Sequence, residues 1–140
     1  MISWILDTGP LVAYLASTDP AHAKVTLLLD GFSGLLLTTS AVVTEAMYFV
    51  ASVPRGPRVL AEFLAASGAQ VHDFTQPRDL GEAVALMEKY ADTPMDYADA
   101  TLVLLAERLN VLDVLTLDRR GFSVYRTRRR QALRQVLQQR

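Results

Sequence analysis

Isolated carboxylates within apolar stretches constrain this chain more than any other feature of its sequence. Asp7 is the only charged residue in the first 18 positions, and Glu45 is the only one between positions 34 and 53. Asp99 and Asp118 each adjoin a run rich in leucine and valine. Acidic side chains are rarely buried without a partner, so a fold that buries these stretches must provide one.

Ordinary ion pairing does not provide that partner, because lysine and arginine are nearly absent from the same stretches. Burying a carboxylate alone costs several kcal/mol. A hard divalent cation shared by several carboxylates removes this cost, since it prefers oxygen ligands. The sequence therefore predicts one acidic pocket, fed from four separate parts of the chain, that holds a metal ion.

Length and composition favour one compact domain. The chain has 140 residues, of which 51% are hydrophobic, and we expect a single domain over residues 1–140. The absence of cysteine excludes disulfides and thiolate metal sites. No basic residues precede the apolar N-terminal run, and no stretch approaches roughly 20 apolar residues. We therefore expect neither a signal peptide nor a membrane span, and a cytoplasmic location.

The net charge of -1 hides an uneven distribution of charge. Eight arginines and no acidic residue follow Asp118, whereas 15 acidic and six basic residues lie at or before it. A basic C-terminal segment over residues 119–140 favours a polyanionic or acidic partner, with a solvated arginine-rich tail as an equal alternative.

Short apolar segments alternate with helical ones. Strands are predicted over residues 2–6, 35–38, 69–72, 113–117 and, at an edge, 122–125. Helices are predicted up to residue 16, from residue 20 after an Asp19 cap, and over residues 41–51, 58–66, 79–91 and 96–109. We expect Ser40 to cap the third helix, and we expect Leu80, Val84 and Met87 to face the core.

This alternation predicts an α/β fold, with a mainly parallel central sheet of four or five strands and helices on both faces. Such sheets bind ligands beyond the carboxyl ends of their strands. Asp7 and Asp118 directly follow predicted strands, and Asp99 lies near the start of a helix. Glu45 lies in a helix that we expect to be buried on most of its circumference.

Carboxylates at these positions suit phosphodiester chemistry. Two magnesium ions about 4 Å apart can activate a water and stabilise the leaving oxygen, and no histidine is needed. The two histidines, His22 and His72, have no ligand-like spacing and are interpreted as structural or surface residues.

Most of the acids also have a structural interpretation. Asp7 is a candidate helix cap, and Asp118 is a candidate turn residue. Asp96 and Asp99 are candidate first-turn acids that the helix dipole favours, a role that we prefer for Asp96. Glu45 is the hardest to explain in this way, because its neighbours in the sequence offer no cation.

Four short motifs occur in a characteristic order between residues 5 and 122. They are Ile5-Leu6-Asp7-Thr8, Ser40-Ala41-Val42-Val43-Thr44-Glu45, Tyr97-Ala98-Asp99-Ala100 and Leu115-Thr116-Leu117-Asp118-Arg119-Arg120-Gly121-Phe122. Together they resemble the PIN-domain family, and within it the small VapC-type toxin ribonucleases of bacterial and archaeal toxin–antitoxin pairs.

The resemblance implies a parallel-sheet fold, cleavage of RNA that depends on Mg²⁺ or Mn²⁺, a homodimer and a cognate VapB-like antitoxin protein. It assigns catalysis and metal binding to Asp7, Glu45, Asp99 and Asp118. It gives an outer, orienting role to Asp96, Thr8 and Thr116. Two residues depart from the family pattern: Gly9 stands where a polar residue is frequent, and Gly121 where an acidic one is frequent.

The predicted function is Mg²⁺-dependent hydrolysis of RNA by a toxin endoribonuclease. The alternative is a catalytically inactive PIN-like module that binds RNA or protein. A haloacid-dehalogenase-like phosphatase requires an aspartate where the chain has Gly9, and a receiver domain requires an acidic pair and a lysine that are missing. Cleavage of DNA stays open, because no residue recognisably reads a 2′-hydroxyl. The arginines after Asp118 are candidates for contacts with the RNA backbone or the antitoxin.

Overall fold

The apolar run at the N-terminus forms the central strand of a parallel sheet. The computed structural model describes residues 1–139. The strands are β1 (Ser3–Leu6), β2 (Leu35–Thr39), β3 (Gln70–His72), β4 (Asp113–Leu115) and β5 (Arg134–Gln135). Their order in the sheet is β3-β2-β1-β4-β5, and every pairing is parallel. The predicted fold class is confirmed.

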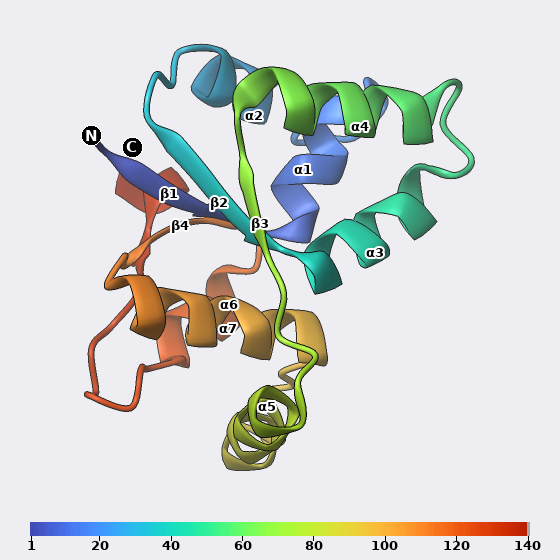
Figure 1. Cartoon of the computed structure of the whole chain (residues 1–140). Helices are drawn as coiled ribbons and strands as arrows, with labels where there is room; N and C mark the ends of the chain where they lie inside the picture. Colours follow the sequence, from blue (N-terminus) through green and yellow to red (C-terminus); the bar gives the residue numbers. More distant parts are fainter. Residues whose placement is uncertain (140) are drawn as a thin grey trace.

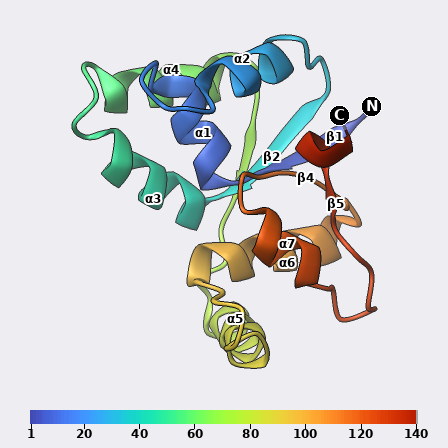
Figure 2. The same ribbon diagram turned by 180° about the vertical axis from the view of Figure 1, so that it is seen from behind.

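Helices cover both faces of this sheet (Figures 1 and 2). They are α1 (Thr8–Leu15), α2 (His22–Asp30), α3 (Ser40–Val50), α4 (Gly56–Ser67), α5 (Pro77–Lys89), α6 (Tyr97–Leu109) and α7 (Arg119–Val124). The first layer contains α1, α2 and α4, and the second contains α6 and α7, with α5 packed outside α6. Helix α3 leaves the end of β2 and contacts both α1 and α6.

Helix α6 is buried on most of its circumference because it lies between the sheet and α5. Its buried residues include Ala100, Leu102, Val103, Leu104, Leu105 and Ala106. Its one buried hydroxyl, Thr101 Oγ1, donates to Ala98 O at 2.6 Å and therefore accepts its 2.8 Å bond from Thr39 Oγ1. This bond joins the start of α3 to α6.

Residues 122–125 do not form the predicted edge strand. Residues Arg119–Val124 form α7 instead, and β5 supplies the edge. Phe122 and Tyr125 are fully buried and lie three positions apart, which places both on one side of a helical turn. The apolar composition of this segment is therefore explained by helix packing and not by strand pairing.

Two predictions about helix caps were also wrong. Thr39, and not Ser40, caps α3, because its side chain accepts from Val42 N. Helix α2 begins at His22, and the Asp19 carboxylate instead accepts from the backbone of the preceding turn.

The buried face of α5 also differs from the prediction. Leu80 and Val84 are 41% and 49% exposed, whereas Ala83 and Leu86 face the core. Met87 packs against the core, as predicted. An ion pair decides this rotation: Asp79 Oδ1 accepts from Arg108 Nη2 of α6 at 2.8 Å, so the helix turns its acidic side chain inward. Between residues 1 and 139, no helix is both long and apolar enough to cross a membrane.

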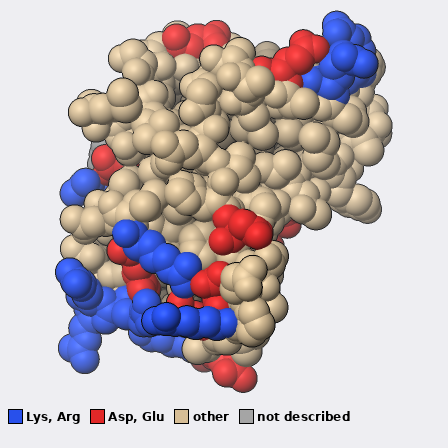
Figure 3. Space-filling view, viewed as in Figure 1, with Lys and Arg blue, Asp and Glu red and all other residues tan. Residues whose placement is uncertain are grey.

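Part of the basic C-terminal segment is neutralised within the chain. Arg128 lies 2.6 Å from Glu107 and 3.5 Å from Glu82, and Arg134 lies 2.7 Å from Asp113. Figure 3 shows Lys and Arg side chains gathered over the α5–α6 end of the molecule, with acidic side chains between them. Arg140, the last residue of the predicted segment, lies outside the described residues.

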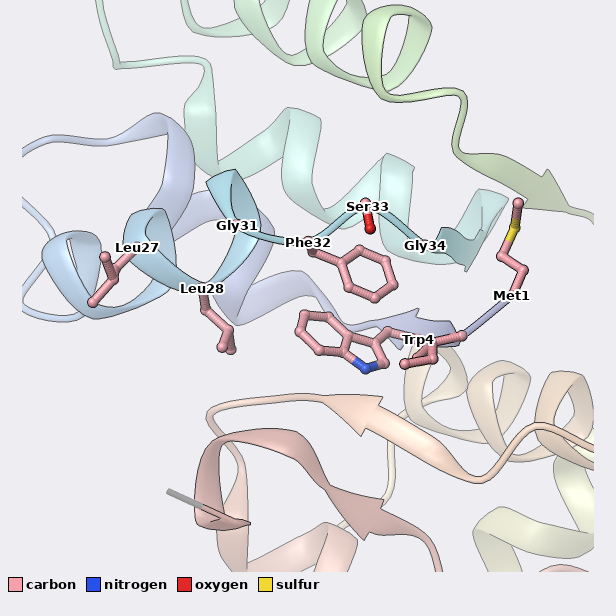
Figure 4. Close-up of a pocket in the computed structure, with 9 residues that line it drawn as sticks. Met1, Trp4, Leu27, Leu28, Gly31, Phe32, Ser33 and Gly34 are labelled. Atoms are coloured by element: carbon pink, nitrogen blue, oxygen red, sulfur yellow. The ribbon is translucent and has the colours of Figure 1, made fainter.

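The amino ends of β1 and β2 enclose a hollow of about 440 Å³ (Figure 4). Trp4 and Phe32 stack beside it, with ring centroids 3.8 Å apart. Gly34 lies two residues after Phe32, directly before β2. A Cβ on Gly34 would stand 2.1 Å from the Ile2 carbonyl oxygen. That oxygen already accepts from Leu35 N at 2.9 Å, so the backbones of β1 and β2 cannot separate easily.

Replacing Gly34 with alanine should therefore lower the free energy of unfolding, by about 1–3 kcal/mol, because the added methyl group overpacks a hydrogen-bonded backbone. Gly81→Ala in α5 is the matched control, since a Cβ at that position meets no atom within 4 Å. It should raise stability by about 0.5–1 kcal/mol. Urea unfolding of both variants measures the difference, and equal stabilities would contradict the packing described.

Candidate active site

The carboxyl ends of β1 and β4 open into a cleft of about 500 Å³, here called the acidic cleft. Its walls come from the starts of α1, α6 and α7 and from the middle of α3. The carboxylates that line it are Asp7, Asp19, Glu45, Asp96, Asp99 and Asp118. No lysine, arginine or histidine is among its lining residues. The four acids that the sequence singled out therefore come together, with Asp96 beside them.

Asp7 is the deepest of these carboxylates, with only 7% of its surface exposed. It directly follows β1, and its backbone N–H donates to Leu115 O of β4 at 3.0 Å. Its Oδ1 accepts from Thr8 N at 2.8 Å, which makes Asp7 the N-cap of α1. Its Oδ2 accepts from the Thr116 hydroxyl at 2.7 Å.

Thr116 connects two of the acids. Its buried hydroxyl donates to Asp7 and accepts from Asp118 N at 2.9 Å. A single side chain directly after β4 therefore sets the position of Asp7 and the start of the segment that carries Asp118. Thr8 differs: its backbone contacts Asp7, but its buried hydroxyl has no hydrogen-bond partner within the described residues.

Asp96 and Asp99 form a reciprocal capping box at the start of α6. Asp99 N donates to Asp96 Oδ1 at 2.8 Å, and Asp96 N donates to Asp99 Oδ2 at 3.1 Å. Asp96 is exposed and Asp99 is half-buried. Asp96 is therefore the N-cap of α6 and not a first-turn acid as predicted, and Asp99 occupies the first turn. The Asp96 side chain also lines the acidic cleft.

Asp118 is the exposed N-cap of α7, and its Oδ1 accepts from Gly121 N at 3.0 Å. A Cβ on Gly121 would stand 2.5 Å from Asp118 Oδ2 and 2.9 Å from the Tyr125 hydroxyl. This close approach explains why the chain has glycine where the resemblance led us to expect an acidic residue.

Glu45 is less buried than the sequence predicted. Only Val42, Ala46 and Val50 of α3 are buried, and Glu45 is half-exposed on the cleft side. Within residues 1–139, its carboxylate has no hydrogen bond or ion pair. Sequence reasoning missed two other lining residues, Asp19 and Phe49. Asp19 was interpreted only as a helix cap, and Phe49 gave no signal because its helix was expected to be buried.

Two pKa values report the electrostatic cost of this arrangement. Burial raises the pKa of Asp7 from 3.8 to about 6, and the charges of Asp96 and Asp118 add to the effect, while hydrogen bonds from Thr116 and Thr8 oppose it. Burial also raises the pKa of Asp99 from 3.8 to about 8, with further increases from the charges of Asp96 and Asp7. The negative charges in the cleft are thus not balanced by the protein itself.

The donor set fits a hard divalent cation. All the candidate ligands are carboxylate oxygens, and like charges that raise one another's pKa values are stabilised when a cation binds between them. In the part of the chain that the structure describes, no three acidic or imidazole groups stand close enough to hold an ion as they are. Several of these oxygens instead accept from helix-capping N–H groups.

Comparisons with known proteins agree with this geometry. The sequence matches the family model for the PIN domain over residues 4–127. It is 36% identical over 125 residues to the ribonuclease VapC26 of Mycobacterium tuberculosis, covering 87% of this chain and 91% of that protein.

The fold is similar to the crystal structure of VapC20 of Mycobacterium tuberculosis, described as a toxin that cleaves the sarcin–ricin loop. The TM-score is 0.75 and the identity is 14%, over 84% of this chain and 91% of that one. The sequence match over residues 4–127 and the 36% identity show that this chain belongs to the PIN-domain family.

Proposed function

We propose that this chain is the toxin of a toxin–antitoxin pair, an endoribonuclease that hydrolyses RNA phosphodiester bonds with the help of Mg²⁺, for which Mn²⁺ can substitute. The observation that carries the proposal is the acidic cleft, where six carboxylates converge and no cationic side chain of residues 1–139 lines the space. The relative at 36% identity is named a ribonuclease, and the structural neighbour is described as an RNA-cleaving toxin.

The proposed ligands follow from burial and position. Asp7 and Asp99 would hold the principal ion, because they are the two acids whose pKa values burial and neighbouring charges raise most clearly. Glu45 and Asp118 would complete the set. When bound, the divalent cation would polarise the phosphodiester and lower the pKa of a water molecule.

The remaining steps belong to the protein. Asp118 is the most exposed of the four acids, and we assign it acceptance of the proton from the attacking water. Thr116 holds Asp7 through its hydroxyl, and Asp96 shapes the start of α6. The acidic cleft repels phosphate in the absence of the cation, so RNA should bind there only to the metal-loaded protein.

The proposed partners are the RNA substrate, a VapB-like antitoxin and a second copy of the chain, all in the cytoplasm. The relatives support the first two partners. The exposed Leu80 and Val84 on α5 support the third, because exposed large apolar side chains on one helix face favour a subunit contact.

Asp7→Asn and Asp99→Asn should each lower the rate of RNA cleavage by about 100-fold or more, because each removes a charged ligand. Cleavage of a labelled, structured RNA with Mg²⁺, Mn²⁺ or EDTA measures this loss. Asp92→Asn, at an exposed acid that does not line the cleft, is the matched control and should retain activity. Cleavage that survives EDTA, or equal rates in all variants, would favour the inactive binding module.

Thr116→Val should reduce cleavage about tenfold and move the acidic limb of the pH–rate profile to higher pH. The reason is that the Thr116 hydroxyl lowers the pKa of Asp7, so without it protons compete better with the metal. Thr116→Ser keeps the hydroxyl and should restore both properties. A variant with an unchanged pH profile would show that this hydroxyl does not act through Asp7.

Asp99→Asn should raise the melting temperature of the metal-free protein at pH 8, by roughly 3 °C or more. The pKa of Asp99 is about 8 in the folded protein against an ordinary 3.8, so ionisation destabilises the folded state increasingly as the pH rises from about 4 to 8. The increase in melting temperature that Asp99→Asn produces should therefore be smaller at pH 5. Thermal unfolding in EDTA measures it, with Asp92→Asn as control, and a lower melting temperature at pH 8 would contradict the assigned repulsion.

A further inference from the structure

A second hollow adjoins the acidic cleft and has a different chemistry. It has a volume of about 360 Å³, within the range of small-ligand sites, and lies between the starts of α3 and α6. Glu45 and Asp96 line both spaces, so the hollow and the cleft meet at these two side chains. A ligand that extends past Glu45 therefore occupies both the second hollow and the acidic cleft.

Four hydroxyl groups line this second hollow, and all of them donate their proton elsewhere in the protein. Ser40 Oγ donates to Asp73 Oδ1 at 2.7 Å, and Thr75 Oγ1 donates to Asp73 Oδ2 at 2.8 Å. Thr44 Oγ1 donates to Ser40 O at 2.9 Å. The Tyr97 hydroxyl donates to Phe74 O at 2.6 Å.

Only acceptor capacity remains on these side chains. A hydroxyl has one proton and two lone pairs, so a hydroxyl whose proton is committed can only accept further hydrogen bonds. Glu45 and Asp96 add carboxylate oxygens, and among the described residues no lysine, arginine, histidine, asparagine or glutamine lines the space. We call it the acceptor pocket. Backbone N–H groups in the first turns of α3 and α6 are its remaining donors.

We propose that the acceptor pocket binds the base of a nucleotide beside the scissile phosphate and selects an exocyclic amino group. The inference rests on the proposed ribonuclease function and deepens it. A phosphate does not suit the pocket, because Glu45 and Asp96 would repel it. A single ribose hydroxyl would leave most of the acceptors unused, whereas a base fills a space of this size and can reach several of them.

The consequence is a preference among bases. Adenine, cytosine and guanine each carry an exocyclic amino group, whereas uracil presents carbonyl oxygens at the equivalent positions. A carbonyl oxygen placed against Glu45, Asp96 and the committed hydroxyls finds no side-chain donor there and is repelled by the two carboxylates. The discrimination follows because the proton of each of the four hydroxyls is engaged in an internal hydrogen bond and is not offered to a carbonyl oxygen, while a carboxylate has no proton to offer.

The test begins with a hairpin RNA whose loop the wild-type protein cuts in Mg²⁺. At each nucleotide that flanks the cut, adenosine is replaced by purine riboside, guanosine by inosine and cytidine by uridine, each of which removes the amino group. At one flanking position, this loss should lower kcat/KM about tenfold or more, as expected for hydrogen bonds to charged acceptors. A 2′-deoxy substitution at the same position should have a smaller effect.

Thr44→Val removes one committed hydroxyl from an exposed position of α3. In this variant, the kcat/KM values for the RNA with and without the amino group should differ by no more than about threefold. Thr26→Val on α2 makes the same substitution outside the pocket and should keep the wild-type ratio. Circular dichroism checks that both variants fold. As a direct measurement, adenosine monophosphate should shift the NMR signals of Thr44 and Ala98, and purine riboside monophosphate should not.

Equal rates for all bases would overturn the inference and leave the ribonuclease function intact. A dominant 2′-deoxy effect would also overturn it, because the pocket would then recognise the ribose. If the wild-type protein cuts no RNA, the proposed function fails, and the NMR comparison alone decides whether the pocket selects an amino group.

Discussion

Negative charge gathered at one end of a parallel sheet is the constraint on which this structure depends. Asp7 lies buried where the central strand ends, and its charge must be held by neighbouring groups. Asp7 accepts two hydrogen bonds that do this, one from the first N–H group of α1 and one from the Thr116 hydroxyl just after the adjacent strand. Asp99 and Asp118 are held in the same way by N–H groups at the starts of α6 and α7. One helix of the first layer, α1, and both α6 and α7 of the second therefore begin at the acidic cleft.

The structural and functional interpretations of these acids turn out to be compatible. A capping carboxylate uses some of its lone pairs on backbone N–H groups and keeps the others for a ligand. Capping fixes where each acid stands, but it does not remove the repulsion that raises the pKa values of Asp7 and Asp99. The metal-free protein thus stores unfavourable electrostatic energy at the place where a cation would relieve it, as expected where function competes with stability.

Much of the fold was predictable from the chain. The order of elements, the parallel sheet and the gathering of the four acids follow from apolar runs that end in an acid or a helix cap. The cap of α3 and the start of α2 were misplaced by only a few residues, whereas the larger errors arise from contacts between distant residues. Residues 119–124 form a helix because Phe122 and Tyr125 pack into the core. Helix α5 turns Asp79 inward to meet Arg108 of α6, and no local pattern in either helix contains that pairing.

The sequence by itself determined which acids are candidates for the chemistry, because isolated acids in apolar surroundings are visible without coordinates. Only the tertiary structure decided how those residues are held. Thr116 lies 109 positions from Asp7, and Asp73 lies 33 positions from the Ser40 hydroxyl whose proton it accepts. The acceptor pocket is likewise a property of hydrogen-bond direction. A hydroxyl in a sequence is both donor and acceptor, and its folded surroundings alone determine which capacity is left for a ligand.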